Sequence, residues 1–316
     1  NLNMKNIYKN SLYNQNKAKK ILKNNKVISV PTETVYGLAG NAYSDKSIKR
    51  IYKLKKRPKK NPLIIHYYSL SDLKRDVYFD NKFLKLYKNF SPGPLTYILK
   101  KRVSSKISPL ANARLNTVAV RFPKNKIVRS LLKKLNFPLA MPSANISTGV
   151  SPTNSFDVLD EFGNKIKFIL DGGKSKIGLE STVVNLHGQV KILRPGAISK
   201  YQISKILGKK IPYLTKIKKI NSPGMLKKHY SPGIPMKLNS TKPDYNAAFI
   251  VFGKQYKKRK DMFNLSKKSN LNEAAKNLYK VLRKIKKMKY KKINIVKIPN
   301  RDIGIAINDR LKKASN

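Results

Sequence analysis

The sequence predicts an α/β protein in which a large mixed α/β domain is followed by a linker and a smaller α/β unit. Short β-branched runs and helical runs both occur up to residue 208, but they do not alternate regularly, which argues against a simple doubly wound sheet. Residues 209–238 hold several Pro and Gly residues and no long periodic segment. A chain of 316 residues suits about two domains. We therefore expect domains at 1–208 and 239–316, joined by a linker at 209–238.

The first domain is predicted to begin with a loose helical pattern in residues 5–25. Runs rich in β-branched and aromatic residues predict strands at residues 27–30, 62–66, 95–99, 117–122, 137–141, 168–170 and 181–186. Amphipathic runs predict helices at residues 44–56, 127–135 and 156–162, and a short helix at 199–207 that ends at Gly208. Asn125 is the expected N-cap of the second of these helices, and Thr153 or Ser155 that of the third.

The C-terminal unit reads as strand, helix, strand, helix. An apolar run at 247–253 predicts a strand, a periodic segment at 271–287 a helix, and a second apolar run at 293–298 another strand. A last helix is expected near residues 304–313. The spacing of strand, helix and strand is typical of a βαβ unit, in which the two strands are parallel.

The chain is extremely basic. Lys and Arg number 70 against 15 Asp and Glu, which gives a formal net charge of +55. Such a charge attracts polyanions, meaning RNA, nucleotide phosphates or anionic lipid. The basic residues are spread over the whole length, however, so drift in composition is the favoured cause. Weak, salt-sensitive binding to RNA is expected under either interpretation.

Several classes of site and compartment are excluded or disfavoured. The chain has no cysteine, which removes disulfides, thiol nucleophiles and Cys-based zinc sites. It has neither a Walker A loop nor a G-x-G-x-x-G loop. No run approaches the roughly 20 apolar residues that cross a bilayer, and the first residues lack the apolar core of a secretory signal. We expect a cytoplasmic protein with no membrane partner.

Residues suited to chemistry gather between Val30 and His66, where predicted strands end. The first strand runs into a turn that contains Thr34, and a basic turn with Lys55 and Arg57 precedes the strand that ends at His66. Open α/β sheets bind ligands at such strand ends. Lys55 and Arg57 suit a phosphate clamp, because Arg offers a planar fork and Lys a point charge. A solvated basic turn and a structural histidine are the plainer alternatives.

Further polar residues lie around later strand ends. Ser143 and Asn145 flank a turn that could hold phosphate oxygens, or that is an ordinary Asx or Ser turn. Glu180 could hold Mg²⁺ or pair with a lysine. Arg194 precedes a Pro-Gly turn, and Tyr230 of the linker could stack on a nucleotide or anchor the linker.

Taken in order and at their spacing, these motifs resemble the Sua5/YrdC family of threonylcarbamoyl-AMP synthases. The motifs that carry the resemblance are PTETVYGL, K-x-R-P with NPLI-x-H, SPGPLT, TVAVRFP, PSAN, SPT, DGG, ESTVV, LRPG and PGM with HYSP, which cover residues 27–235. The C-terminal segment ending in GIAINDRLKKASN resembles the companion domain of the two-domain Sua5 type. The resemblance implies a YrdC-like domain with a twisted mixed sheet, followed by a smaller Rossmann-like Sua5 C-terminal domain.

The resemblance also implies roles for individual residues. It assigns L-threonine binding to Thr34, His66, Arg121, Ser181 and the Met141 backbone. It assigns ATP binding to Arg57, Asn61, Thr117, Ser143, Ser151, Arg194 and Tyr230. The family's K-x-R and S-x-N signature, expected to be catalytic, falls on Lys55, Arg57, Ser143 and Asn145. Mg²⁺ is expected with ATP, and the linker that carries Tyr230 is expected to fold over the site as a lid.

The activity implied is ATP-dependent synthesis of L-threonylcarbamoyl-AMP from threonine and bicarbonate or CO₂, with release of pyrophosphate. In the family, this product serves t6A modification at position 37 of tRNAs that decode ANN codons. Expected partners are therefore ATP, threonine, bicarbonate, tRNA or double-stranded RNA, and a threonylcarbamoyl transferase complex. The alternative is a non-catalytic module that binds double-stranded RNA or tRNA. A hydrogenase-maturation carbamoyltransferase, whose family carries Cys-rich zinc motifs, is set aside because this chain has no cysteine.

Overall fold

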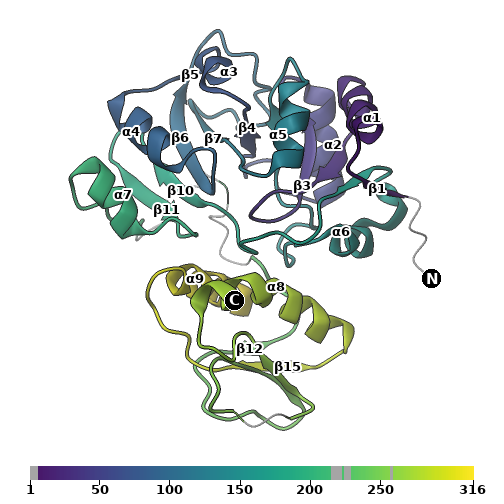
Figure 1. Cartoon of the computed structure of the whole chain (residues 1–316), viewed down its shortest axis with the longest axis vertical. Coiled ribbons are helices and arrows are strands. Elements are labelled where there is room, and N and C mark those ends of the chain that lie inside the picture. The colour runs from purple at the N-terminus through teal and green to yellow at the C-terminus, as the bar shows by residue number, and fades with distance from the viewer. Residues whose placement is uncertain (1–5, 215–222, 224–228, 257–258) are drawn as a thin grey trace.

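The computed structural model describes residues 6–214, 223, 229–256 and 259–316. Its strands form a large and a small sheet, and two helices lie between the two bodies in Figure 1: α8 (Leu271–Lys287) and α9 (Gly304–Ser315). These helices carry the contacts that join the C-terminal unit to the rest of the chain, so their inner faces bear on any site near the boundary.

The large sheet is mixed. Its strands are β1 (Ile7–Lys9), β2 (Ile28–Val30), β3 (Gly37–Asn41), β4 (Ile64–His66), β5 (Val77–Tyr78), β6 (Leu95–Lys101), β7 (Thr117–Arg121), β8 (Leu139–Ala140), β9 (Ile169–Asp171), β10 (Thr182–Asn185) and β11 (Lys191–Arg194). They lie in the order β1-β9-β2-β3-β8-β4-β7-β6-β10-β11, with β5 against β6. Strand β4 is parallel to β7 but antiparallel to β8, and β7 is antiparallel to β6. The predicted mixed sheet without regular strand–helix alternation is confirmed.

Helices flank this sheet. They are α1 (Leu12–Lys23), α2 (Asp45–Lys55), α3 (Leu70–Lys74), α4 (Asn81–Phe90), α5 (Lys126–Lys133), α6 (Ser155–Phe162) and α7 (Lys200–Leu207), with a 3₁₀ turn at Gly163–Lys165. Asn125 caps α5, as predicted, by accepting from the Ile127 amide at 2.9 Å. The predicted cap of α6 is wrong. Asn154 caps it, because its side-chain oxygen accepts from the Asp157 amide at 2.9 Å while Thr153 bonds the Asp157 carboxylate.

The small sheet contains β12 (Met236–Lys237), β13 (Ala247–Val251), β14 (Met262–Asn264) and β15 (Lys292–Ile295), in the order β12-β15-β13-β14. All its pairings are parallel, and α8 connects β14 to β15, so the predicted βαβ unit is confirmed. Strand β12 falls inside the predicted linker, which means that this sheet begins before residue 239. The domain boundaries themselves stay a prediction.

Several elements were not predicted. Strand β3 has the sequence GLAGN, whose glycines disfavour a strand by propensity. It is formed by antiparallel pairing with β2 and β8, and the glycines fit the tight space there: a Cβ on Gly37 would lie 3.3 Å from Met141, and one on Gly40 would lie 3.0 Å from Ile51. Helix α4 carried a readable signal, since Asp80 caps it and Phe83 and Leu86 are buried at helical spacing. The other unpredicted elements are β1, α3, β5, β11, β12 and β14, all of five residues or fewer.

Apolar contacts continue across the boundary between the two units. Val35, Val150, Leu179 and Tyr230 belong to the same buried cluster as the core of the C-terminal unit. Gly178 packs so closely on α8 that an added Cβ would lie 2.7 Å from the Lys276 Cα. The interface is therefore packed like a core. No helix among the described residues combines the length and apolar character needed to cross a membrane.

Candidate active site

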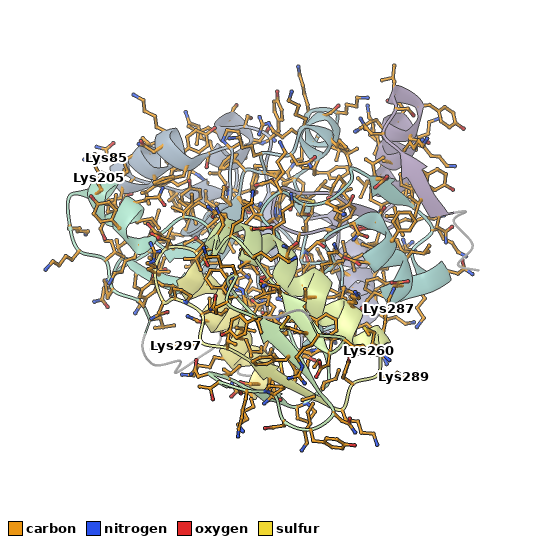
Figure 2. The ribbon with its side chains drawn as sticks, turned by 60° about the horizontal axis from the view of Figure 1, so that its bottom comes forward. Lys85, Lys205, Lys260, Lys287, Lys289 and Lys297 are labelled. Atoms are coloured by element: carbon orange, nitrogen blue, oxygen red, sulfur yellow. The ribbon has the colours of Figure 1, made fainter. Side chains whose placement is uncertain are left out.

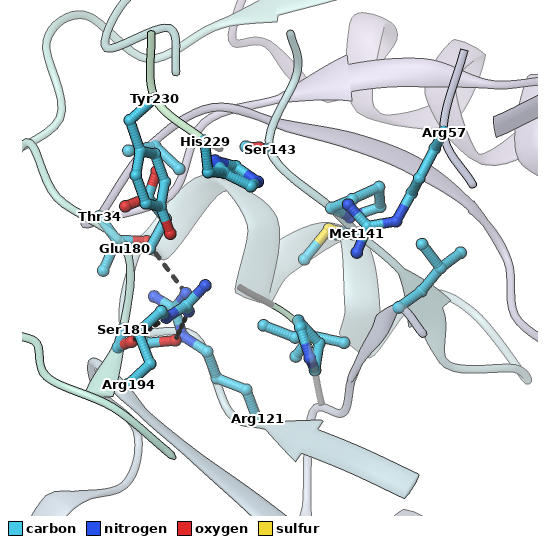
Figure 3. Close-up of a pocket in the computed structure, with 15 residues that line it drawn as sticks. Thr34, Arg57, Arg121, Met141, Ser143, Glu180, Ser181, Arg194, His229 and Tyr230 are labelled. Atoms are coloured by element: carbon cyan, nitrogen blue, oxygen red, sulfur yellow. Dashed lines mark hydrogen bonds between the residues drawn. The ribbon is translucent and has the colours of Figure 1, made fainter. Parts of the chain in front are cut away.

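One pocket lies at the strand ends that border the C-terminal unit (Figure 3). Its cavity volume is about 50 Å³, and it is lined by Thr34, Val35, Arg57, Leu63, Ile64, Arg121, Met141, Pro142, Ser143, Glu180, Ser181, Arg194, Pro223, His229 and Tyr230. Most of the candidate residues thus meet in one place, although they are spread over almost two hundred positions of sequence. The candidates outside this lining are Lys55, Asn61, His66, Thr117, Asn145 and Ser151.

A buried arginine forms one end of the pocket. Arg121, at the end of β7, is 4% exposed, and its Nη2 lies 2.6 Å from the Glu33 carboxylate. Its Nη1 donates to the Thr34 hydroxyl at 3.0 Å and its Nε to the Gly93 carbonyl at 3.2 Å. Burial raises the pKa of Glu33, but the Arg121 charge, the hydrogen bond from Arg121 and the backbone hydrogen bonds together outweigh that effect, so the net pKa is lowered and Glu33 stays ionised. Two guanidinium hydrogens remain to bind an anion.

The candidate histidine, His66, lies on the strand next to that of Arg121. His66 is 2% exposed, pairs with Arg121 in the register of β4 and β7, and has its Nδ1 3.1 Å from the Ile64 carbonyl oxygen. Burial and then the Arg121 charge hold its pKa well below the ordinary range. The imidazole is therefore neutral at physiological pH, which suits a hydrogen-bonding role rather than a charged one.

The K-x-R and S-x-N segments contact each other through Lys55. Its ammonium group points to the backbone of the S-x-N turn and not into the pocket. The Lys55 Nζ donates to the backbone carbonyls of Ser143 and Asn145, the latter at 2.6 Å, and the residue is 1% exposed. Burial, and then the Arg57 charge, lower the pKa of Lys55 well below its usual value. In this conformation Lys55 fixes the turn that presents Ser143, and Asn145 completes that turn by donating to the Gly149 carbonyl at 2.9 Å.

Arg57 presents its guanidinium at the opposite end of the pocket. Its Nη2 donates to the Asn61 Oδ1 at 2.7 Å and to the Pro62 carbonyl at 2.8 Å. The buried Nδ2 of Asn61 has no hydrogen-bond partner among the described residues. Arg194, at the end of β11, donates through Nη2 to the Ser181 hydroxyl at 3.1 Å. Thr117 lies at the start of β7, opposite Lys100, and does not reach the pocket.

Two residues of the predicted linker cover the pocket, as expected of a lid. The rings of His229 and Tyr230 lie 4.0 Å apart, and Tyr230 is fully buried with a left-handed φ of 63°. The Tyr230 hydroxyl and the His229 Nδ1 have no hydrogen-bond partner among the described residues. Burial lowers the pKa of His229 to about 3, so this ring is also neutral. Residues 224–228 of the same motif lie outside the described residues.

Glu180 pairs with an arginine, Arg310, and not with the Mg²⁺ or lysine expected from the sequence. Its Oε1 accepts from the Ser151 hydroxyl at 2.6 Å, and its Oε2 accepts from Tyr279 at 2.8 Å and from the Arg310 Nε at 3.0 Å. Burial raises the pKa of Glu180, but Arg310 and Arg194 outweigh it and bring the pKa to about 2. Both carboxylate oxygens are thus engaged by protein donors, so an ion pair with arginine is favoured over a metal-ligand role.

The donor set does not suit a metal ion held by the protein alone. Within the described residues there is no group of three His, Asp or Glu side chains placed to bind one. The acids closest to the pocket, Glu33 and Glu180, are both held by arginine. Mg²⁺ prefers carboxylates together with substrate phosphates, so the phosphates would have to supply most of its ligands here.

Sequence reasoning missed Glu33, Tyr279 and Arg310 as parts of this site. Glu33 stands in the recognised PTETV motif. Acids are scarce in this chain, so an acid beside a strand end could have been singled out as a candidate. Tyr279 and Arg310 come from α8 and α9, far along the chain, and no local pattern connects them to the pocket. Arg310 does lie within the GIAINDRLKKASN segment on which the C-terminal resemblance rests.

Comparison with known proteins gives consistent results. The Sua5_yciO_yrdC family model, described as telomere recombination, matches residues 20–196, and the Sua5_C model, described as the threonylcarbamoyl-AMP synthase C-terminal domain, matches residues 198–316. Threonylcarbamoyl-AMP synthases of Pyrococcus abyssi and Bacillus subtilis are each 34% identical to this chain. The two alignments cover 93% and 94% of this chain and 92% of each relative.

Solved structures agree with the sequence relatives. The crystal structure of P. abyssi Sua5 complexed with L-threonine matches with a TM-score of 0.89 and 31% identity, over 98% of this chain and 97% of that one. The likeness includes both sheets, because it extends over nearly the whole of each chain. By sequence, fold and the residues of its pocket, the chain belongs to the Sua5/YrdC family of threonylcarbamoyl-AMP synthases, in the two-domain Sua5 form.

Proposed function

We propose that this chain joins L-threonine, bicarbonate or CO₂, and ATP into L-threonylcarbamoyl-AMP and releases pyrophosphate. The observation that carries the proposal is a pocket with cations at both ends and no free carboxylate among its described lining residues. Figure 3 places Arg121 and Arg194 on one side of the pocket, around Ser181, and Arg57 on the other, while Glu180 is already paired. The P. abyssi relative, solved with L-threonine, supports the identity of the amino acid.

Threonine would bind at the end formed by Arg121. The two guanidinium hydrogens left free by Glu33, Thr34 and Gly93 suit a carboxylate. Thr34 and Ser181 line the pocket and offer short polar contacts for the threonine hydroxyl, while the neutral His66 lies just outside the lining, and the Met141 backbone closes that side. A buried partner for the hydroxyl would reject amino acids that lack it, by leaving that partner unpaired.

ATP would bind toward Arg57 and Arg194, with Ser143 supplying a hydroxyl and Tyr230 an aromatic face. Asn61 holds the Arg57 guanidinium by accepting a hydrogen bond from it, and Ser151 holds Glu180 by donating one to its carboxylate. Lys55 contributes by holding the turn that carries Ser143. Mg²⁺ would enter with the nucleotide and supply further positive charge, because the pocket carboxylates Glu33 and Glu180 are already paired with arginine.

The chemistry places few demands on the chain beyond position and charge. The neutral threonine amine adds to CO₂ and loses a proton, which gives a carbamate. A carbamate oxygen then attacks the α-phosphorus, the bond to the bridging oxygen of the β-phosphate breaks, and pyrophosphate leaves. Both reactants are anions, so the arginines lower the barrier by offsetting repulsion and by fixing the reacting groups in line. No covalent protein intermediate is needed.

The test is pyrophosphate release from Mg-ATP by the full chain, with and without L-threonine and bicarbonate. Release that requires both, and that falls strongly when L-serine replaces threonine, is the expected outcome. Release without amino acid would indicate a simple pyrophosphohydrolase. Absence of release from folded protein that still binds RNA would favour the alternative of a non-catalytic RNA-binding module.

We extend the proposal to tRNA, with the adenylate passing to a threonylcarbamoyl transferase complex for t6A formation in the cytoplasm. Figure 2 places labelled lysines on both units, Lys85 and Lys205 on one and Lys260, Lys287, Lys289 and Lys297 on the other. Charge dispersed in this way favours weak binding to any polyanion over a single RNA groove. Affinity for tRNA is therefore expected to fall steeply with salt and to discriminate little between sequences.

A further inference from the structure

The C-terminal unit places a fully buried arginine against the wall of the pocket. Arg310, on α9, is 1% exposed. Its Nε lies 3.0 Å from the Glu180 Oε2, and its Nη1 donates to the Pro195 carbonyl at 2.9 Å. Its guanidinium lies 5.0 Å from the centre of the Tyr230 ring. One side chain of the second unit thus contacts three separate segments that line or flank the pocket.

Each of these contacts is adjacent to a residue assigned to ATP in the proposed function. The Glu180 carboxylate also accepts from Ser151, and the Pro195 carbonyl follows Arg194 in the chain. Tyr230 itself packs between Arg310 and the Tyr279 ring, whose centre is 6.0 Å away. By contrast, the partners that hold Arg121, at the proposed threonine end, within the described part of the chain are Glu33, Thr34 and Gly93, all of the first unit.

We propose that Arg310 is a positioning residue for ATP, through which docking of the C-terminal unit completes the nucleotide end of the pocket. The proposal rests on the proposed function and adds a role for the second domain. Arg310 neutralises Glu180, which would otherwise present an unpaired anion where phosphates must bind. It also fixes the Pro195 carbonyl and the Tyr230 ring, so the positions of Arg194 and the lid depend on it.

A kinetic experiment separates this role from general stabilisation of the interface. Arg310→Met is compared with Arg283→Met, because Arg283, on α8, also crosses the interface. It pairs with Glu161 at 3.2 Å and donates to the Val150 carbonyl, but no hydrogen bond or ion pair among the described residues joins it to Glu180, Pro195 or Tyr230. We expect Arg310→Met to raise the KM for Mg-ATP at least about tenfold while the KM for threonine changes little. Arg283→Met should lower the unfolding midpoint without that selective change. Equal effects of the two variants on both constants would overturn the proposal.

Glu180→Gln tests whether Arg310 acts through the carboxylate. In the Arg310→Met background, Glu180→Gln removes the unpaired charge, so part of the ATP affinity should return, and the two changes should be clearly non-additive. Additive losses would contradict this step. If Arg310→Met does not fold, the doubly substituted chain and Arg310→Lys, which keeps the charge but loses the fork, provide the same comparison.

A separate readout distinguishes failure of this inference from failure of the proposed function. Wild-type protein that releases no pyrophosphate would reject the proposed reaction, but calorimetric titration with Mg-ATP would still compare the variants. Weaker nucleotide binding by Arg310→Met than by Arg283→Met would then support the positioning role. Wild-type activity together with unchanged kinetics and ATP binding in folded Arg310→Met would reject the positioning role alone.

Discussion

The two ends of the pocket are built from the same kind of interaction but from different parts of the chain. At the end proposed for threonine, Arg121 pairs with Glu33 at 2.6 Å; Arg121 ends β7 and Glu33 lies in the turn after β2. At the end proposed for ATP, Glu180 pairs with Arg310 at 3.0 Å, across the boundary between the two units. The first pair forms with the large sheet, whereas the second also requires the C-terminal unit to dock. We call the end with the Arg121–Glu33 pair the preformed end, because it needs only the large sheet. We call the end with the Arg310–Glu180 pair the conditional end, because it also needs the C-terminal unit to dock.

Loss of the arginine at the preformed end should have the largest effect. Arg121→Met is expected to lower kcat/KM for threonine by about a hundredfold or more and to lower the free energy of unfolding by roughly 3–5 kcal/mol, because Glu33 is left buried and unpaired. Adding Glu33→Gln should recover much of the stability but none of the activity. Steady-state kinetics and urea unfolding provide the measurements, and recovery of activity in the double variant would contradict the assignment of Arg121 to substrate.

The conditional end should be sensitive to acid. Arg310, Arg194 and the Ser151 hydroxyl hold the pKa of Glu180 at about 2, below its ordinary value of 4.5. A depressed pKa stabilises the fold above the unfolded-state pKa, and that stabilisation, roughly 3 kcal/mol, is lost as pH falls from about 4.5 toward 2. Urea unfolding of wild type and Glu180→Gln should therefore differ near neutral pH and converge near pH 2. A difference that did not depend on pH would contradict the ionised pair.

Close packing between the units can be tested without touching a charge. Gly178 has a φ of 82°, and an added Cβ would lie 2.7 Å from the Lys276 Cα of helix α8. Gly188 has a similar φ of 75°, but an added Cβ there meets nothing within 4 Å. Gly188→Ala should lower the free energy of unfolding by about 1 kcal/mol, which is the cost of a positive φ at alanine. Gly178→Ala should lower it by about 2–4 kcal/mol, because the clash with helix α8 adds to the same cost. Equal losses by thermal or urea unfolding would show that the units are not tightly docked.

The smallest expected effect concerns the lid. The Tyr230 hydroxyl is buried and unpaired among the described residues, so Tyr230→Phe should leave the free energy of unfolding unchanged within about 0.5 kcal/mol or raise it slightly. If the hydroxyl binds nucleotide, the KM for ATP should nevertheless rise several-fold. Steady-state kinetics at varied ATP checks this. A Phe variant with wild-type KM would limit Tyr230 to packing and stacking.

Much of the preformed end could be predicted from the sequence. Strands β4, β6, β7 and β10 are rich in β-branched residues, and Thr34, Arg121 and Ser143 were assigned to the site from motifs beside them. The glycine-rich β3 was not predicted, because it forms by pairing with β2 and β8 and its glycines fit close to Met141 and Ile51, neither of which propensity shows. Local pattern does not report such packing.

The conditional end was less accessible to sequence reasoning. Lys55 was expected to clamp phosphate, yet its ammonium bonds two backbone carbonyls, because side-chain direction depends on where the Ser143 turn lies in space. Arg310 is 130 positions from Glu180, and nothing near either residue indicates the other. Contacts between units are decided by docking, which a single sequence shows only through resemblance to relatives.

The acids of the pocket share one property with the other acidic residues of the chain: each has a hydrogen-bond or ion-pair partner. The chain has only 15 Asp and Glu residues, and each of them accepts a hydrogen bond or forms an ion pair in the structure. Lysine fills the surface, yet acids persist where a cap, a buried hydroxyl or an arginine requires one. Glu33 and Glu180 are among the most deeply buried of these acids, so their loss would leave a buried arginine without its partner.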